Sequence, residues 1–188
     1  IAPDVLYHLA GAAHIGQSWS AAGDTLAVNV LATHHVLEGI RVAGLPTRVI
    51  IPSSAYVYRP ADHALGEDDP LEPANPYAIS KIATELAARR ATIHDGIPVV
   101  VARSFNHLGP RQDASFFGSA VARQIAQIEA GLLDPVLRVG NLDARRDFTD
   151  VRDTVRAYVA LAERGRPGRI YNVCSGHARV MRELLDGL

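Results

Sequence analysis

RVIIPSSAYVY at residues 48–58 and NPYAISK at residues 75–81 are two motifs joined by a polar loop. The first begins as an apolar run typical of a buried β-strand and ends in a pair of serines before its tyrosines. The second begins like a helix, because Asn75 suits the N-cap position and Pro76 suits the first helical position. The two motifs therefore predict a strand, a loop and a helix in that order.

Three side chains of these motifs can meet around one carbonyl group. Tyr77 and Lys81 are four residues apart, so a helix projects them from the same face, and Ser54 ends the strand. An ammonium beside a phenol favours the phenolate, so we expect Lys81 to lower the pKa of Tyr77. The phenol would then serve as a general acid or base, and the serine hydroxyl would hydrogen-bond the reacting oxygen. The alternative is a surface helix on which Tyr77 and Lys81 share a face by chance.

Segments of strand and helix character alternate along the first half of the chain. We expect strands at residues 4–9, 49–51 and 98–102, and helices at residues 22–43 and 76–95. This β-α-β-α-β order predicts an α/β fold with a doubly wound parallel sheet. No G-x-G-x-x-G motif follows a first strand, so we expect an internal piece of a larger Rossmann-like protein whose N-terminal units are missing here.

The second half of the chain has a different character. We expect a loop at residues 104–115, a helix at 116–130, a strand at 136–139, a charged turn at 146–151, a helix at 153–164, a strand at 169–173 and a last helix from about residue 180. Residues 1–110 are therefore expected to hold the sheet. Residues 111–188 are expected to form mainly a small lobe, interleaved with returns to the main sheet.

Composition and charge argue against several classes of function. The formal net charge of −1 and the scattered basic residues give no electrostatic footprint for nucleic acid. No apolar run approaches the ~20 residues of a membrane span, and no signal peptide is visible, so we expect a protein without a membrane partner. The eight histidines are dispersed, so we expect no metal site. The single cysteine, Cys174, suits a cytoplasmic protein and is expected to lie in the core after a buried strand.

Five further stretches carry a family resemblance, together with the Ser…Tyr-x-x-x-Lys pattern. They are HLAG at residues 8–11, NVLAT at 29–33, RSFNHLGPRQ at 103–112, VGNLDARRDFTDVRD at 139–153 and YNVCSG at 171–176. With them, the whole chain resembles the extended short-chain dehydrogenase/reductase family, in its nucleotide-sugar-modifying epimerase/dehydratase branch. Within that branch it is most similar to the reductases of GDP-4-keto-6-deoxymannose.

The resemblance implies an NAD(P)-dependent oxidoreductase that reduces the C4 ketone of a GDP-4-keto-6-deoxymannose to a GDP-rhamnose. It implies that Tyr77 gives a proton to the C4 oxygen, that Ser54 hydrogen-bonds this oxygen, and that Lys81 holds the nicotinamide ribose. Residues 1–110 would then be the C-terminal part of a dinucleotide-binding sheet. Residues 111–188 would be mainly a substrate-binding lobe.

The resemblance also assigns residues to the cofactor, which is NADP or NAD. These cofactor-binding residues, besides Tyr77 and Lys81, are Leu9, Ala10, Gly11 and His107. His14 and Ser18 match positions at the edge of the pocket, and Ser53 is expected to be structural. For His107 a structural hydrogen bond remains the alternative, and for His14 the alternative is a role at a helix start.

A GDP-sugar is the implied substrate, and its diphosphate suits guanidinium groups, which donate two parallel hydrogen bonds. Besides Ser54, the implied substrate-binding residues are Asn106, Arg123, Arg146 and Arg179. A solvated surface charge is the alternative interpretation for the arginines.

Position 56 separates two activities within the branch. The 4,6-dehydratases carry a Thr-x-Glu whose glutamate takes the C5 proton, whereas Ser54 and Tyr56 stand at these positions here. A carbonyl reduction needs no such carboxylate, so reduction is preferred and a dehydratase or epimerase is the alternative. A non-catalytic nucleotide-binding fragment is a further alternative, against which the Ser-Tyr-Lys set argues. The resemblance also implies a homodimer of the full-length protein, formed through the helix that carries Tyr77.

Overall fold

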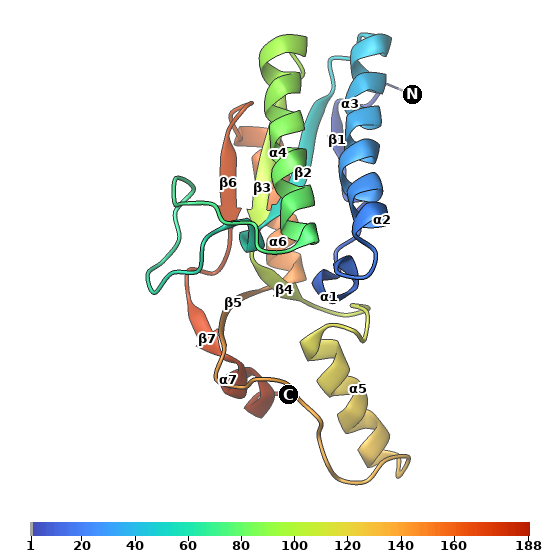
Figure 1. The fold of residues 1–188 in the computed structure, drawn as a ribbon, viewed down its shortest axis with the longest axis vertical. Helices are drawn as coiled ribbons and strands as arrows, with labels where there is room; N and C mark the ends of the chain where they lie inside the picture. Colours follow the sequence, from blue (N-terminus) through green and yellow to red (C-terminus); the bar gives the residue numbers. More distant parts are fainter. Residues whose placement is uncertain (1) are drawn as a thin grey trace. The chain divides into compact units, whose positions relative to one another are not determined.

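The computed structural model describes residues 2–188, which divide into two compact units (Figure 1). Unit 1 contains the chain up to Phe105 and returns with Val155–Val173. Unit 2 contains Asn106–Thr154 and Cys174–Leu188. Each unit is described by itself below.

Unit 1 is built on a parallel sheet with the strand order β1-β2-β3-β6. Its strands are β1 (Val5–Tyr7), β2 (Arg48–Ser54), β3 (Val99–Ser104) and β6 (Ile170–Val173). All three pairings are parallel, and the register places Ser53 opposite Arg103 and Ser54 opposite Ser104. The predicted α/β fold with a parallel sheet is therefore confirmed.

Helices cover both faces of this sheet, so that its central strands are buried on both sides. On one face α3 (Ala32–Ala43) and α4 (Pro76–Asp95) lie side by side (Figure 1), and a core cluster unites residues of both helices with residues of β2 and β3. On the other face, Ile50 and Val100 pack against Ala162 of α6 (Val151–Arg164). Alternate strand residues therefore point toward α4 or toward α6.

The helical segment at residues 22–43 forms as predicted but contains one wide turn. It consists of α2 (Ala22–Leu26), a π-helical turn at Ala27–Leu31 and α3, after a short helix α1 (Ile15–Ser18). The face that the segment buries near its start is polar, with Thr25, Asn29 and Thr33, whereas Leu26 is exposed. The apolar period predicts the helix but not the face that it buries.

Helix α4 has the predicted start and end. The Asn75 side chain accepts a hydrogen bond from the Ala78 amide at 2.8 Å, and Gly96 ends the helix with a left-handed φ of 70°. Its buried face consists of small and polar side chains, whereas Ile79 and Leu86 are exposed. The 3-10 turn η2 (Ala55–Val57) lies between β2 and the loop that leads to α4.

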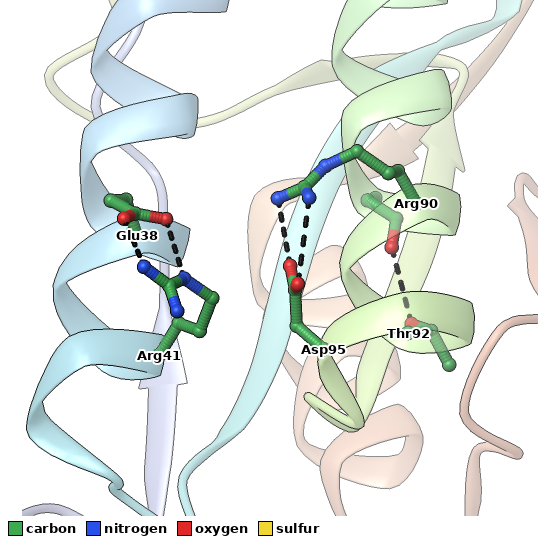
Figure 2. A network of polar contacts seen from close by, with 6 residues as sticks. Glu38, Arg41, Arg90, Thr92 and Asp95 are labelled. Carbon is green, nitrogen blue, oxygen red and sulfur yellow. Dashed lines mark hydrogen bonds and ion pairs between the residues drawn. The ribbon is translucent and has the colours of Figure 1, made fainter.

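Ion pairs link side chains within α3 and within α4 (Figure 2). Glu38 pairs with Arg41 on α3, and Arg90 pairs with Asp95 at 2.7 Å on α4. Exposed pairs of this kind contribute little to stability, about 0–1 kcal/mol each.

Unit 2 contains a three-stranded sheet with the order β4-β5-β7 and two helices. Its elements are β4 (Asn106–Leu108), α5 (Phe117–Glu129), β5 (Arg145–Asp150), β7 (Ala178–Val180) and α7 (Met181–Asp186). The helices at residues 116–130 and from 180 are confirmed.

Three predictions in unit 2 are wrong. The expected loop at residues 104–115 contains β4, the expected charged turn at 146–151 is largely β5, and the expected strand at 136–139 does not form. In that last segment the Gln124 side chain takes the place of a partner strand. Its amide oxygen accepts from Arg138 N at 2.9 Å and its amide nitrogen donates to Arg138 O at 3.1 Å.

Within residues 2–188, the structure has no helix whose length and hydropathy would let it cross a bilayer. The same residues contain no group of three or more His, Cys, Asp or Glu side chains arranged to hold a metal ion.

Candidate active site

Ser54, Tyr77 and Lys81 are brought together in unit 1 by two elements. Strand β2 ends at Ser54, and α4 presents Tyr77 and Lys81 one turn apart. The Tyr77 side chain is buried, and the Ser54 hydroxyl lies close enough to its phenol to lower the pKa of Tyr77. The Lys81 ammonium lies over the Tyr77 ring, 5.7 Å from its centroid. The three side chains therefore have the convergence that a carbonyl-reducing site needs, although their catalytic roles stay predictions.

The pKa of Tyr77 is raised. Burial is the largest cause; the Ser54 hydrogen bond acts in the opposite direction, and the Tyr158 and Tyr56 phenols add to the rise. The expectation that Lys81 sets a lowered pKa for Tyr77 is therefore wrong for this structure. The physical reason is that the phenol loses water on burial, while the ammonium donates to the Pro52 carbonyl at 3.0 Å.

Lys81 is the only lysine in the sequence, all other permanent cations being arginines. Burial lowers the pKa of Lys81 to about 8, against the charge of Glu85, which raises it. Burial and the Lys81 charge together lower the pKa of His8, whose Nε2 lies 3.0 Å from Thr33 Oγ1. The ammonium has three N–H donors, one of which is used by Pro52 O, so it can also bind ribose hydroxyls.

The buried Asn29 joins the loop after β1 to the Tyr77 helix. Its Oδ1 accepts from Ala12 N at 2.7 Å, and its Nδ2 donates to Ala12 O at 3.0 Å and to Ser80 Oγ at 2.8 Å. Ser80 Oγ in turn donates to the Tyr77 carbonyl at 2.7 Å. Asn29 lies in the π-helical turn, a distortion that is frequent at functional sites.

Gly11 is needed where this loop passes Asn29. A Cβ at Gly11 would lie 2.9 Å from Asn29 Oδ1 and 3.9 Å from Lys81 Nζ. The neighbouring Leu9, Ala10 and Gly11 are exposed, so their backbone is open to a ligand at the carboxyl end of β1. Small side chains beside a lysine fit a bound nucleotide whose ribose Lys81 would hold.

Two further hydroxyls lie at the ends of neighbouring elements in unit 1. Ser104, opposite Ser54 in the register of β2 and β3, forms a 2.6 Å hydrogen bond with the buried Tyr158 of α6. Burial raises the pKa of Tyr158, and the Ser104 hydrogen bond opposes the rise. On the other face of the same strands, Ser53 donates to Glu85 at 2.5 Å, as its expected structural role requires.

Sequence reasoning missed Glu85 and Tyr158, and it included Asn29 only as the first residue of the NVLAT stretch that carries the family resemblance. A signal existed for Glu85, since a carboxylate four residues after Lys81 interrupts a run of small and apolar residues. No local signal marks Tyr158, because its partner is 54 residues away in the sequence.

In unit 2, Arg146 and Arg179 are cross-strand neighbours. They occupy one register pair of the antiparallel strands β5 and β7, and both are exposed. The buried Asp147 holds the loop before β7 by accepting from the backbone amides of residues 175, 176 and 177 at 2.9, 2.8 and 3.1 Å. The carboxylate thereby fixes the segment that leads to Arg179.

Asn106 and His107 both lie on β4, whereas Arg123 lies on a different element, α5. Asn106 Nδ2 donates to the Asp147 carbonyl at 3.3 Å, and the His107 carbonyl accepts from Gln112 Nε2 at 2.9 Å. Arg123 is exposed on α5. The structure therefore places Asn106 beside the Arg146 strand and leaves the substrate role of Arg123 a prediction.

Three remaining predictions concern positions outside the convergent set. His14 caps α1 by accepting from Gln17 N at 3.2 Å, which is the helix-start role, and Ser18 is buried with its hydroxyl on Ile15 O. Cys174 is exposed, so its expected place in the core is wrong. The reason is that β6 ends at Val173, and the next residue already belongs to a loop of unit 2.

Known proteins resemble this chain over nearly its whole length. It is 40% identical to a GDP-6-deoxy-D-mannose reductase from Pseudomonas aeruginosa over 98% of the chain and 62% of that protein. It is 33% identical to a dTDP-glucose 4,6-dehydratase from Streptomyces griseus over 97% of the chain and 54% of that protein. The chain thus spans little more than half the length of these relatives.

A solved structure has the same fold. It is a structure of RMD from Pseudomonas aeruginosa complexed with NADPH, with a TM-score of 0.93 and 40% identity over 98% of this chain and 65% of the other. The family model described as GDP-mannose 4,6 dehydratase matches residues 1–187. The chain belongs to the GDP-mannose 4,6-dehydratase family.

Proposed function

We propose that the full-length protein reduces the C4 ketone of a GDP-4-keto-6-deoxymannose with hydride from NADPH or NADH, giving GDP-rhamnose. The observation that carries the proposal is the Ser54–Tyr77 hydroxyl pair, with a second phenol, Tyr56, where a dehydratase needs a carboxylate. The pKa of Tyr77 is shifted by its burial, by the Ser54 hydroxyl and by the phenols of Tyr158 and Tyr56. A site of this kind can supply a proton, and no carboxylate is among the groups that shift the pKa of Tyr77.

In this reaction the proton comes from the chain. When bound, the nicotinamide cofactor would supply a hydride to C4, and the electron pair of the carbonyl π bond would move onto the oxygen. Tyr77 gives its hydroxyl proton to that oxygen; its raised pKa keeps the phenol protonated at neutral pH and makes it a weaker acid. Ser54 donates a hydrogen bond to the same oxygen, and the tyrosinate is reprotonated from solvent.

The cofactor is assigned to the carboxyl end of β1 and to α4. Gly11 and its small neighbour Ala10 leave room for a nucleotide, Leu9 offers an exposed apolar side chain, and Lys81 offers N–H donors to the ribose. His107 is assigned to the cofactor on the resemblance alone. NADP and NAD both remain assignments, and the relative of known structure is complexed with NADPH.

The GDP-sugar diphosphate is assigned to Arg146 and Arg179. Two guanidinium groups on one register pair repel each other, and an anion bound by both removes this repulsion. Asn106 and Arg123 are assigned to the same substrate on weaker grounds, since one bonds a backbone carbonyl and the other is solvated.

A homodimer of the full-length protein is proposed from the outer face of α4. Ile79, Leu86 and Ile93 recur every seven residues and are 49%, 60% and 62% exposed. A stripe of large apolar side chains at this spacing is the pattern by which helices pack on each other. A second copy of the chain is the occupant that we assign to it.

A 4,6-dehydratase is the second candidate function, because the family model carries that description and a dehydratase is among the relatives. Both activities can be tested on one full-length preparation. With GDP-4-keto-6-deoxymannose and NADPH, we expect loss of the reduced-nicotinamide absorbance and a GDP-rhamnose product. Turnover of GDP-mannose without added reductant would support the dehydratase instead. Binding of nucleotide with neither activity would leave only a binding function.

A further inference from the structure

The buried carboxylate of Glu85 lies one helical turn after Lys81 on α4. Glu85 is 7% exposed, and its Oε1 accepts from Ser53 Oγ at 2.5 Å and from Arg103 Nε at 2.9 Å. Its Oε2 accepts from a second nitrogen of Arg103 at 2.8 Å. One carboxylate thus joins α4 to the ends of both β2 and β3.

The positive partner is also buried and fully engaged. Arg103 is 3% exposed, and its third nitrogen donates to the Tyr58 hydroxyl and to the Glu67 carbonyl, each at 2.9 Å. A buried ion pair gives little net stability, because desolvation offsets the attraction between its charges. The presence of such a pair beside the proposed active site therefore needs an explanation other than stability.

Strand geometry connects this pair to the reacting side chains. Successive residues of a strand point to opposite faces, so Ser53 meets Glu85 on the α4 face while Ser54 points to the other face. The carboxylate therefore fixes the residue directly before Ser54. It also fixes the helix that carries Tyr77 and Lys81.

The charge of Glu85 acts on Lys81 as well. The titratable groups that face the ammonium are His8 directly after β1, the Tyr77 ring from the preceding turn of α4, and Glu85 from the following turn. The polar group contributed by β2 is the neutral Pro52 carbonyl. Of these groups, Glu85 is the only carboxylate, and it is paired with Arg103.

We propose that Glu85 is a positioning residue of this active site, which holds α4 against β2 and β3 through Ser53 and Arg103 and keeps the buried Lys81 ammonium charged. The inference rests on the proposed function only in giving Lys81 catalytic work. Its central claim, that the Glu85 carboxylate controls the ionisation of Lys81, can be measured without turnover.

The test is a pH titration of the Lys81 side chain by NMR. The full-length protein is prepared with carbon-13-labelled lysine, and the Lys81 Cε signal is identified by its loss in Lys81→Arg. Because Glu85→Gln removes the nearby negative charge, we expect the Lys81 midpoint to fall by about half a pH unit or more. Two controls keep the charge: Glu85→Asp and Ser53→Ala are expected to leave the midpoint at the wild-type value.

The controls distinguish an effect of the Glu85 charge on Lys81 from a structural effect of the substitution. A merely structural Glu85 would make Glu85→Gln and Glu85→Asp alike in both melting temperature and Lys81 midpoint, which would overturn the inference. If Glu85→Gln does not fold, Glu85→Gln with Arg103→Gln removes both buried charges, and an unchanged Lys81 midpoint in that variant would also overturn it. If Glu85→Gln lowers the Lys81 midpoint but the wild-type protein does not reduce the ketone, the inference stands and the proposed function is refuted.

Discussion

Arg146 and Arg179 stand directly opposite each other on β5 and β7, with no strand residue between them. The Arg146 guanidinium donates a hydrogen bond to the carbonyl of its own neighbour, Arg145, at 2.7 Å. Like charges opposite each other in a sheet are destabilising by about 0.2–1 kcal/mol. The pair of arginines is therefore expected to lower the stability of the sheet and to strengthen the binding of an anion.

Replacement of Arg179 by glutamine should therefore weaken substrate binding without loss of stability. We expect KM for the GDP-sugar to rise by about 10-fold or more, as for the loss of a hydrogen bond to a charged group. The free energy of unfolding should stay equal or rise slightly. Steady-state kinetics and urea denaturation measure the two effects, and Arg90→Gln on α4 is the matched control. A fall in stability with unchanged KM would contradict the diphosphate assignment.

Tyr77→Phe removes the proposed proton donor and keeps the ring. Ketone reduction should fall by at least about 100-fold, the lower end for a general acid, while NADPH binding is retained. Tyr56→Phe is the control that shows which phenol acts, because Tyr56 also lies close enough to influence Tyr77. Equal losses in the two variants would withdraw the assignment of Tyr77.

Gly11→Ala should disturb the site through Asn29. The new methyl group meets Asn29 Oδ1 at 2.9 Å, so we expect a loss of about 1–2 kcal/mol in the free energy of unfolding and weaker cofactor binding. Asn29→Ala removes the clashing atom, so the double variant should be more stable than the sum of the single effects predicts. Denaturation of the four proteins completes the cycle, and strict additivity would speak against the contact.

Lys81→Met should stabilise the protein while it impairs function. Burial lowers the pKa of Lys81 from 10.5 to about 8, so between these values the unfolded chain binds more protons and stability rises with pH. Below about pH 8 the burial penalty is present in full, and the substitution should raise the free energy of unfolding by about 1–3 kcal/mol. The advantage should shrink as the pH rises toward 10.5, which denaturation at several pH values can follow.

Leu86→Glu should dissociate the proposed homodimer. A charge in the middle of the exposed α4 stripe would be buried between the two copies, so the mass in solution should fall by half in light scattering. Val159→Glu alters an exposed apolar residue of α6, on the other layer of unit 1, and should leave the mass unchanged. A wild-type monomer would refute the assignment.

The parts of the fold that follow from local chemistry are predictable from the sequence. Asn75 and Pro76 determine the start of α4, and the β-branched run of β3 determines a strand buried on both faces. Strand β5 is not predictable in this way, because RRDFTD is polar and is held by partners on β4 and β7 that are distant in the sequence. The segment around Arg138 has the apolar pattern of a strand but does not form one, because the Gln124 side chain bonds the backbone N–H and carbonyl of Arg138.

The candidate site is predictable to the same extent. The spacing of Tyr77 and Lys81 and the strand-end Ser54 are sufficient to predict their convergence, because helix and strand geometry fix their directions. The direction of the Tyr77 pKa shift is not predictable from the sequence, because the burial that raises this pKa is a property of the folded unit. The buried pair of Glu85 and Arg103 also depends on packing, because its members are 18 residues apart and lie on different elements.

With a single lysine in its sequence, the chain has one side-chain amine, and that amine is buried at the proposed catalytic position. Acylating reagents, aldehyde cross-linkers and amine-coupled sensor surfaces would therefore find, within these residues, no harmless lysine to modify. Any immobilisation of this part of the protein should use other chemistry, such as the exposed thiol of Cys174.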